Sequence, residues 1–133
     1  MIQSNELRTG NVLLYNTGKK WVHIKCESVQ IEHCEKIPEG FNKRYKPVEV
    51  TRDVLTNLGF KKIDKGAYIY YAKYFNHYDY IGLESPIKIS ISDQSNKLFL
   101  NDRFLMFSRN LHVLQNIIFA ITGTELDTTP IFK

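Results

Sequence analysis

Six of the eight tyrosines of the chain fall within residues 68–80, and this aromatic run is the strongest chemical signal in the sequence. A tyrosine ring stacks on a nucleobase, which contributes about 1–3 kcal/mol per base, and its hydroxyl hydrogen-bonds to water or phosphate. Tyr70, Tyr74 and Tyr78 are therefore candidate stacking residues. Lys73, in the same run, is a candidate for recognising polar groups of the ligand. The alternative is that the run is simply a strand, because strands are rich in aromatic residues.

A second polar feature lies near the C-terminus, where Arg109, His112 and Asn116 are spaced three and four residues apart. On a helix this spacing places them along one strip, with Gln115 beside it. Arginine forks onto phosphate, histidine titrates near neutral pH and amides pair with polar edges. The strip could therefore hold an anion or the edge of a nucleotide. The alternative is an ordinary solvated helix face.

The sequence also holds four potential metal ligands close together, His23, Cys26, His33 and Cys34. Their spacing argues against a metal site, because adjacent residues and residues three apart point to opposite faces of a strand. Signatures of catalysis are missing as well, since the sequence has no glycine-rich phosphate loop, nucleophile elbow or zinc-protease helix motif. We therefore expect no metal, no cofactor, no catalytic residue and no enzymatic activity.

The elements that would position these residues follow from turn and alternation signals. Residues 12–15 and 20–25 are predicted to form a hairpin, since Gly18 supplies the positive φ that a tight turn needs. The alternation of apolar and polar residues over 28–34 predicts a third strand. The prolines and charges of residues 37–47 predict an exposed loop.

Two helices are predicted from their end signals. Thr51 is expected to cap a short helix over residues 52–58, which Gly59 ends. Ser108 is expected to cap a longer helix over residues 109–122, which stops at Gly123. The apolar residues of the longer helix form a wide stripe, so we expect this helix to lie on a sheet and to centre the core.

The second half of the chain between these helices reads mostly as strand. Strands are predicted over residues 60–63, 67–75, 78–83, 87–92 and 97–106. Within the second of these, Tyr70 and Tyr74 share one face while Tyr71 and Phe75 share the other. One face of that strand can therefore be core while the other meets a ligand.

Together these elements predict an α+β fold, with a mostly antiparallel curled sheet, a short middle helix and a C-terminal helix packed on the sheet. The length of 133 residues fits a single domain. We expect a β-meander over 1–36, a loop and short helix over 37–59, antiparallel strands over 60–106, a helix over 108–123 and a tail over 124–133.

Composition bears on the charge of possible partners, the state of the cysteines and the location of the protein, but it does not specify a function. The formal net charge of +4 favours anionic partners without specifying one. Two cysteines are too few for a disulfide scaffold, so free thiols are expected. The sequence shows no secretory signal and no apolar run of membrane-spanning length, so we expect no membrane partner and a cytoplasmic location.

Three blocks of the sequence resemble small uncharacterised proteins of Bacteroidetes phages and prophages. The blocks are Asn5-Glu6-Leu7-Arg8-Thr9-Gly10-Asn11-Val12, the segment from Thr51 to Gly59-Phe60, and the run from Leu111 to Leu126. The resemblance implies a small accessory protein in the cytoplasm of a phage-infected host, a class that often acts without catalysis. It implies no ligand, because that family has no established activity. His112, Gln115 and Asn116 lie inside a matching block, whereas the tyrosine run lies outside all three.

The leading hypothesis is a non-enzymatic phage accessory protein that binds or sequesters an anionic nucleotide-like ligand to counter host defence. Its candidate ligand-binding residues are Tyr70, Lys73, Tyr74, Tyr78, Arg109, His112, Gln115 and Asn116. One alternative is a module that binds single-stranded nucleic acid, since aromatic sheets with basic flanks also do this. Another is a host-protein-blocking or virion-associated interaction protein. Self-association into a homo-oligomer also remains open.

Overall fold

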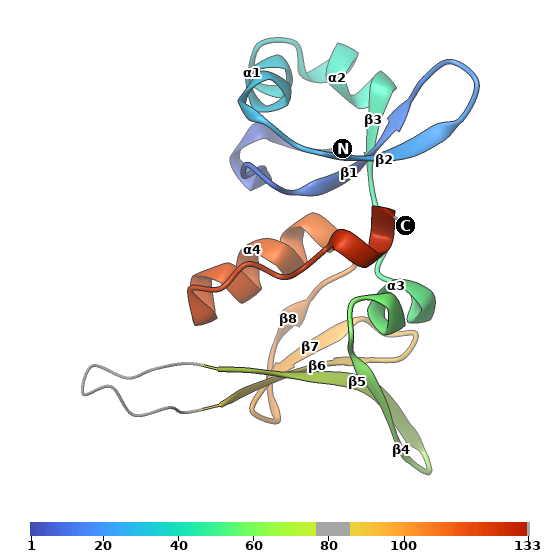
Figure 1. Ribbon diagram of the computed structural model, residues 1–133, viewed down its shortest axis with the longest axis vertical. Coiled ribbons are helices and arrows are strands. Elements are labelled where there is room, and N and C mark those ends of the chain that lie inside the picture. The colour runs from blue at the N-terminus through green and yellow to red at the C-terminus, as the bar shows by residue number, and fades with distance from the viewer. Residues whose placement is uncertain (77–85, 133) are drawn as a thin grey trace.

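A computed structural model describes residues 1–76 and 86–132, and it shows two antiparallel sheets with a helix between them (Figure 1). A three-stranded sheet with two short helices forms one end of the molecule, and a five-stranded sheet forms the other. The C-terminal helix α4 (Leu111–Thr122) lies between them. The predicted α+β class with a C-terminal helix packed on a sheet is confirmed.

The three-stranded sheet has the order β2-β1-β3. It consists of β1 (Val12–Asn16), β2 (Trp21–Lys25) and β3 (Tyr45–Pro47). The predicted hairpin of β1 and β2 is confirmed, with Gly18 at a φ of +95° in the connecting turn.

The segment between β2 and β3 is helical, which corrects two predictions. Residues 28–34 belong to helix α1 (Ser28–Lys36), not to a strand, because the Glu27 and Gln30 side chains form a capping box at its start. Residues 38–44 form α2 (Pro38–Arg44) instead of a loop, with proline in the first turn, where its missing N–H costs nothing. A 3-10 turn, η1 (Ser4–Glu6), precedes β1 near α1.

The five-stranded sheet runs in the order β4-β5-β6-β7-β8, with every neighbouring pair antiparallel. Its strands are β4 (Lys61–Lys65), β5 (Tyr68–Phe75), β6 (Ile87–Ser92), β7 (Lys97–Leu100) and β8 (Arg103–Phe107). The single strand predicted over 97–106 is wrong, because Asn101 and Asp102 take positive φ values of 48° and 69° and turn the chain back on itself. The strand predicted over 78–83 lies outside the described residues.

Both predicted helices are present, and the start of the C-terminal helix is corrected. In α3 (Arg52–Asn57) the Thr51 Oγ1 accepts a hydrogen bond of 3.2 Å from Val54 N, as predicted. Helix α4 begins two residues later than predicted, after Asn110, so Ser108 is not its cap. Gly123 ends α4 at a φ of +71°, as expected. A last 3-10 turn, η2 (Thr129–Phe132), follows.

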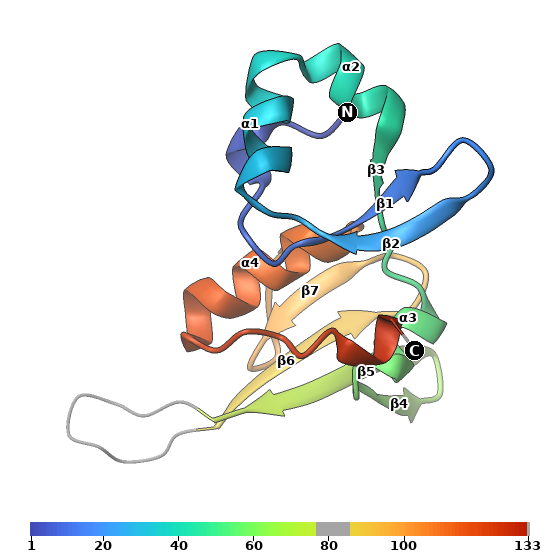
Figure 2. The ribbon, with the colours of Figure 1, turned by 45° about the horizontal axis from the view of Figure 1, so that its top comes forward.

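The core forms where α4 and α3 cover one face of the five-stranded sheet (Figures 1 and 2). Leu111, Leu114 and Ile118 of α4 are fully buried in one cluster with residues of every inner strand. The sheet residues of this cluster are Tyr71, Phe75, Ile89, Ile91 and Leu98. The face that carries these five residues is therefore closed to ligands.

A smaller cluster packs α1 and α2 on the three-stranded sheet and contains both cysteines. Cys26 and Cys34 are buried free thiols, as expected. Burial raises the pKa of Cys26 to about 11, so its thiol stays protonated at neutral pH. Across residues 1–76 and 86–132, no helix combines the length and the apolar character needed to span a membrane.

Candidate ligand-binding face

The polar strip predicted on α4 is covered by the N-terminal segment of the same chain. Gln115 is only 2% exposed, and both ends of its amide are paired with backbone. Its Oε1 accepts a hydrogen bond of 2.8 Å from Val12 N, and its Nε2 donates one of 3.0 Å to Gly10 O. The expectation that Gln115 faces a ligand is wrong, because β1 occupies its hydrogen-bonding atoms.

Asn116 takes part in the same contact. Its Nδ2 donates to Glu6 O at 2.8 Å, and its Oδ1 accepts from Asn11 Nδ2 at 2.8 Å and from Arg8 Nε at 3.2 Å. The guanidinium of Arg8 also forms a bidentate ion pair with the carboxylate of Glu125. The first and last of the three blocks that carry the phage resemblance are therefore packed against each other, and these polar residues serve that packing.

His112 is completely buried and completes this network. Its Nε2 lies 3.2 Å from Glu6 Oε1, and its Nδ1 has no hydrogen-bond partner among the described residues. Burial lowers the pKa of His112 below its usual 6.5, although the hydrogen bond and charge of Glu6 oppose that shift. The imidazole is therefore neutral at pH 7 and inaccessible, which corrects its assignment to an exposed strip.

The buried state of His112 predicts how stability depends on pH. A lowered pKa in the folded state means that the unfolded chain binds the proton more readily, so the free energy of unfolding should fall as pH drops below about 6.5. Denaturant titrations between pH 7.5 and pH 5 measure this loss. The His112→Gln variant should lose much of the pH dependence, whereas His23→Gln, at an exposed position, should keep it. Equal pH dependence in the wild type and His112→Gln would contradict the assignment.

The other predicted residues separate onto two sides of the five-stranded sheet. Lys73 lies on the α3 side, where its Nζ donates a hydrogen bond of 2.8 Å to Leu58 O. Arg109 is exposed beside the start of α4, and its carbonyl accepts from Val50 N at 2.8 Å. Tyr70 and Tyr74 point from the opposite face of β5. The tyrosines and the α4 strip therefore do not form one site. Tyr78 lies outside the described residues.

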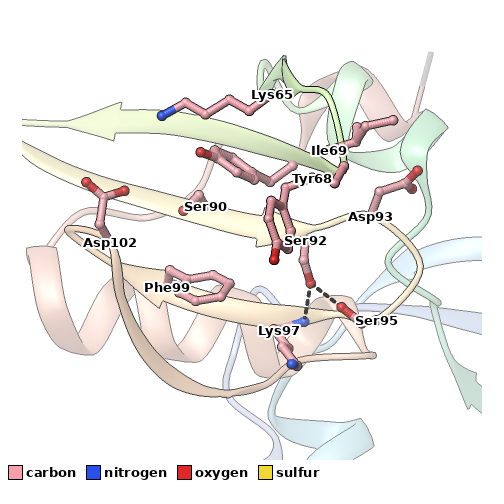
Figure 3. A pocket seen from close by; sticks show the side chains of 12 residues that line it. Lys65, Tyr68, Ile69, Ser90, Ser92, Asp93, Ser95, Lys97, Phe99 and Asp102 are labelled. Atoms are coloured by element: carbon pink, nitrogen blue, oxygen red, sulfur yellow. Dashed lines mark hydrogen bonds between the residues drawn. The ribbon is translucent and has the colours of Figure 1, made fainter.

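The outward face of the five-stranded sheet, called here the open face, has small residues at its centre. In the strand register Ser90 stands between Ala72 of β5 and Phe99 of β7, and Ser92 stands beside Tyr70. These small side chains leave a hollow of about 500 Å³. Figure 3 shows Ser90 and Ser92 on the floor of the hollow, with Phe99 on the neighbouring strand and α4 behind the sheet.

Two lysines, Lys65 and Lys97, line this hollow together with Asp93 and Asp102, and each aspartate is already paired with a cation, Arg52 or Lys88. The ammonium groups of Lys65 and Lys88 each lie 5.9 Å from the centre of the Tyr70 ring. Lys97 lines the hollow from β7. The hydrogen bond from Lys88 Nζ to Asp102, at 2.9 Å, raises the pKa of Lys88, and the carboxylate of Asp102 partly neutralises the ammonium charge. Neither Lys65 nor Lys97 forms an ion pair within the described residues, so both are available to pair with an anionic ligand.

Aromatic rings extend across the open face beyond the hollow. Tyr68, which lines the hollow, is 72% exposed, and Tyr74, beyond it, is 65% exposed; both lie on the same face of β5 as Tyr70. On the other side, Phe104 packs edge-on against Phe99 and Phe107, with ring centres 6.0 and 5.5 Å apart. Soluble proteins seldom expose so many large rings together unless they contact a partner.

Several residues of the open face were missed as site residues, although part of the signal was in the sequence. The strict alternation over 87–92 places Ser90 and Ser92 on the side opposite the isoleucines, and hence away from the core. Phe99 and Phe104 could not be paired, because the turn at Asn101 was read as strand. Among the described residues, no group of three or more His, Cys, Asp or Glu side chains could hold a metal ion.

Comparisons with protein-family models, curated proteins and solved structures find no match for this chain. The assignment of a function therefore depends on the geometry and chemistry of the open face.

Proposed function

We propose that the open face binds an anionic, nucleotide-like ligand, with its base in the hollow between β5 and β7. The observation that supports this proposal most strongly is the position of two serines of β6 between aromatic residues of β5 and β7. This arrangement leaves space for one planar ring and places rings on both sides of it. It keeps Tyr70 and Tyr74 from the predicted set and replaces the α4 residues with Phe99, Lys65 and Lys97.

The dimensions of the sheet suit a flat ring. Strands β5 and β7 are separated by β6, so their backbones lie about 9.6 Å apart at about 4.8 Å per strand. A planar ring in contact with a ring on each side needs about 7–8 Å between them, at 3.5–4.0 Å per contact. Tyr70 is paired with Ser92 and Phe99 with Ser90, so the two rings are offset along the strands, and a base between them would lie obliquely over β6.

The remaining side chains supply the other contacts that a nucleotide needs. Ser90 is only 2% exposed, so it belongs to the floor of the hollow and its hydroxyl is not among the ligand contacts. The Ser92 Oγ already accepts a hydrogen bond of 2.9 Å from Lys97 N, so Ser92 serves mainly as floor. The ammonium groups of Lys65 and Lys97 can neutralise a phosphate at the rim.

In the phage setting that the resemblance implies, this chain would sequester a nucleotide-like molecule of the host and so counter host defence. No described helix lies over the open face, so the hollow favours binding of a ligand that remains partly exposed to solvent.

Thermal and denaturant unfolding with four nucleoside monophosphates and with a thymidylate octamer test this proposal. A base-containing probe should raise the free energy of unfolding by about 2.7 kcal/mol at 100 times its Kd. Inorganic phosphate and an octamer of abasic sugar phosphates serve as controls, and they should stabilise the protein less. The proposal fails if no base-containing probe stabilises the chain, or if the abasic octamer does so equally well.

A further inference from the structure

We infer that the ligand of the open face is a single-stranded nucleic acid, with one base in the hollow and neighbouring bases on the surrounding rings. This inference depends on the proposed function and specifies its ligand class. Three observations support a strand over a free nucleotide: the extent of the aromatic surface, the distribution of lysines and the openness of the hollow.

The aromatic surface is larger than one nucleotide can cover. Tyr74 of β5 lies on one side of the hollow, and Phe104 and Phe107 of β8 lie on the other, with exposed fractions of 53% and 55% for the two phenylalanines. From β4 to β8 the sheet spans four strand spacings, or about 19 Å. Sheets that hold single strands stack two or three bases on such rings, which matches this extent.

Lysines follow the same surface from one edge toward the other. Lys61 and Lys65 of β4 pair with Ala72 and Tyr68, so their side chains share the open face. Lys97 lies three strands further on, in β7. A nucleoside monophosphate carries one phosphate group and can reach only some of these cations, whereas a strand presents a phosphate at every nucleotide.

The hollow is open to solvent, as expected for a ligand that is only partly enclosed when bound. Pockets for free small molecules usually bury 70–90% of the ligand surface. Here no described helix or strand covers the open face, so a bound base would keep an exposed edge that can continue into a chain (Figure 3). The charge and the stacking surface are therefore arranged for a polymer.

A second copy of this chain is the competing occupant, since it could also cover Phe104 and Phe107. The lysines of the open face argue against it, because two copies would bring like charges together unless they met only at β8. Light scattering on the wild type and on Phe104→Ala separates the two. Self-association that is lost in Phe104→Ala, with oligonucleotide affinity unchanged, would overturn the inference.

The main test is the affinity of labelled thymidylates of two, four, eight and twelve nucleotides, measured by fluorescence anisotropy, with uridylates as a parallel series. Affinity should increase with length until the strand crosses the sheet and should then level off. Free thymidine monophosphate should compete at least 100-fold more weakly than the octamer, and a duplex octamer should bind weakly because its bases are already stacked. The parallel series shows whether DNA or RNA is preferred.

Salt dependence supplies an independent readout. Lys61, Lys65 and Lys97 are the lysines of the open face without an ion pair among the described residues. At about 0.7 per phosphate contact, three contacts give a slope near −2 in log affinity against log salt. Lys65→Gln should reduce the steepness by about 0.7, whereas Lys19→Gln, in the β1–β2 turn, should not.

The possible outcomes separate the two proposals. If thymidine monophosphate binds as tightly as the octamer, with little salt dependence, the strand inference is overturned and the nucleotide proposal stands. If no oligonucleotide and none of the four nucleoside monophosphates binds, both fail.

Discussion

Replacing Tyr70 and Phe99 together with alanine is expected to weaken binding of the thymidylate octamer by at least about 30-fold. Each base–ring contact contributes about 1–3 kcal/mol, and the pair forms both walls of the hollow, so their joint loss removes at least about 2 kcal/mol. Both residues point away from the α4 core, so the variant should remain folded. Anisotropy titrations measure the change, with circular dichroism as the test of folding.

The matched control is Trp21→Ala, which removes a large exposed ring from the three-stranded sheet. This ring lies under the Lys46 ammonium at 4.2 Å, so it also resembles a cationic aromatic site. Trp21→Ala should leave the affinity for the octamer within about twofold of the wild type. A folded Tyr70→Ala/Phe99→Ala variant with unchanged affinity, or a large loss in Trp21→Ala alone, would remove the open face as the binding site.

The Gln115→Met variant is expected to lower the free energy of unfolding by about 2–6 kcal/mol. Methionine has nearly the size of glutamine but cannot pair with Val12 N or Gly10 O. Each buried backbone group that loses its partner costs about 1–3 kcal/mol. The loss should therefore exceed that of an ordinary surface substitution and should be measurable by denaturant unfolding.

Gln3→Met makes the same chemical change at an exposed position near the N-terminus, and it should alter stability by no more than about 0.5 kcal/mol. The folded fraction of Gln115→Met should bind the octamer with wild-type affinity, because Gln115 lies on the far side of the sheet from the hollow. If Gln115→Met keeps full stability and loses binding, the residue contacts ligand and the structural role proposed for it is wrong.

Local signals in the sequence were sufficient for the elements whose ends are set by a single residue. The Gly18 turn, the Thr51 cap and the Gly123 helix end each depend on side-chain chemistry within a few residues, and all three appear as predicted. The alternation over 87–92 also predicted β6, because its isoleucines and polar residues must face opposite sides.

Helix α1 was missed because its sequence satisfies two periodicities. Ile31 and Cys34 are three residues apart and reach one core as a helix face, yet the surrounding residues also alternate as in a strand. The capping box at Glu27 decides in favour of the helix, and it is formed by residues that are common in other settings. Tertiary contact with Ile2 and Phe41 then stabilises the result.

The candidate site could be predicted only in part, because sequence spacing does not show what covers a polar helix face. His112 and Asn116 have the spacing of a solvated strip, but their partners Glu6 and Asn11 are more than one hundred residues away in the chain. Alternation placed Tyr70 and Tyr74 together on the face of β5 opposite Tyr71 and Phe75, and this face is the open face. Their counterpart Phe99 required the register across β6, which no local pattern provides.

The most direct test of the central claim is to follow the backbone amide resonances of the isotope-labelled protein while the thymidylate octamer is added. The largest shifts are expected at Tyr70, Ser90, Ser92 and Phe99, with little change in β2 or at the buried face of α4. Shifts concentrated around Trp21 and His23, or an absence of shifts at the open face with the octamer in excess, would contradict it.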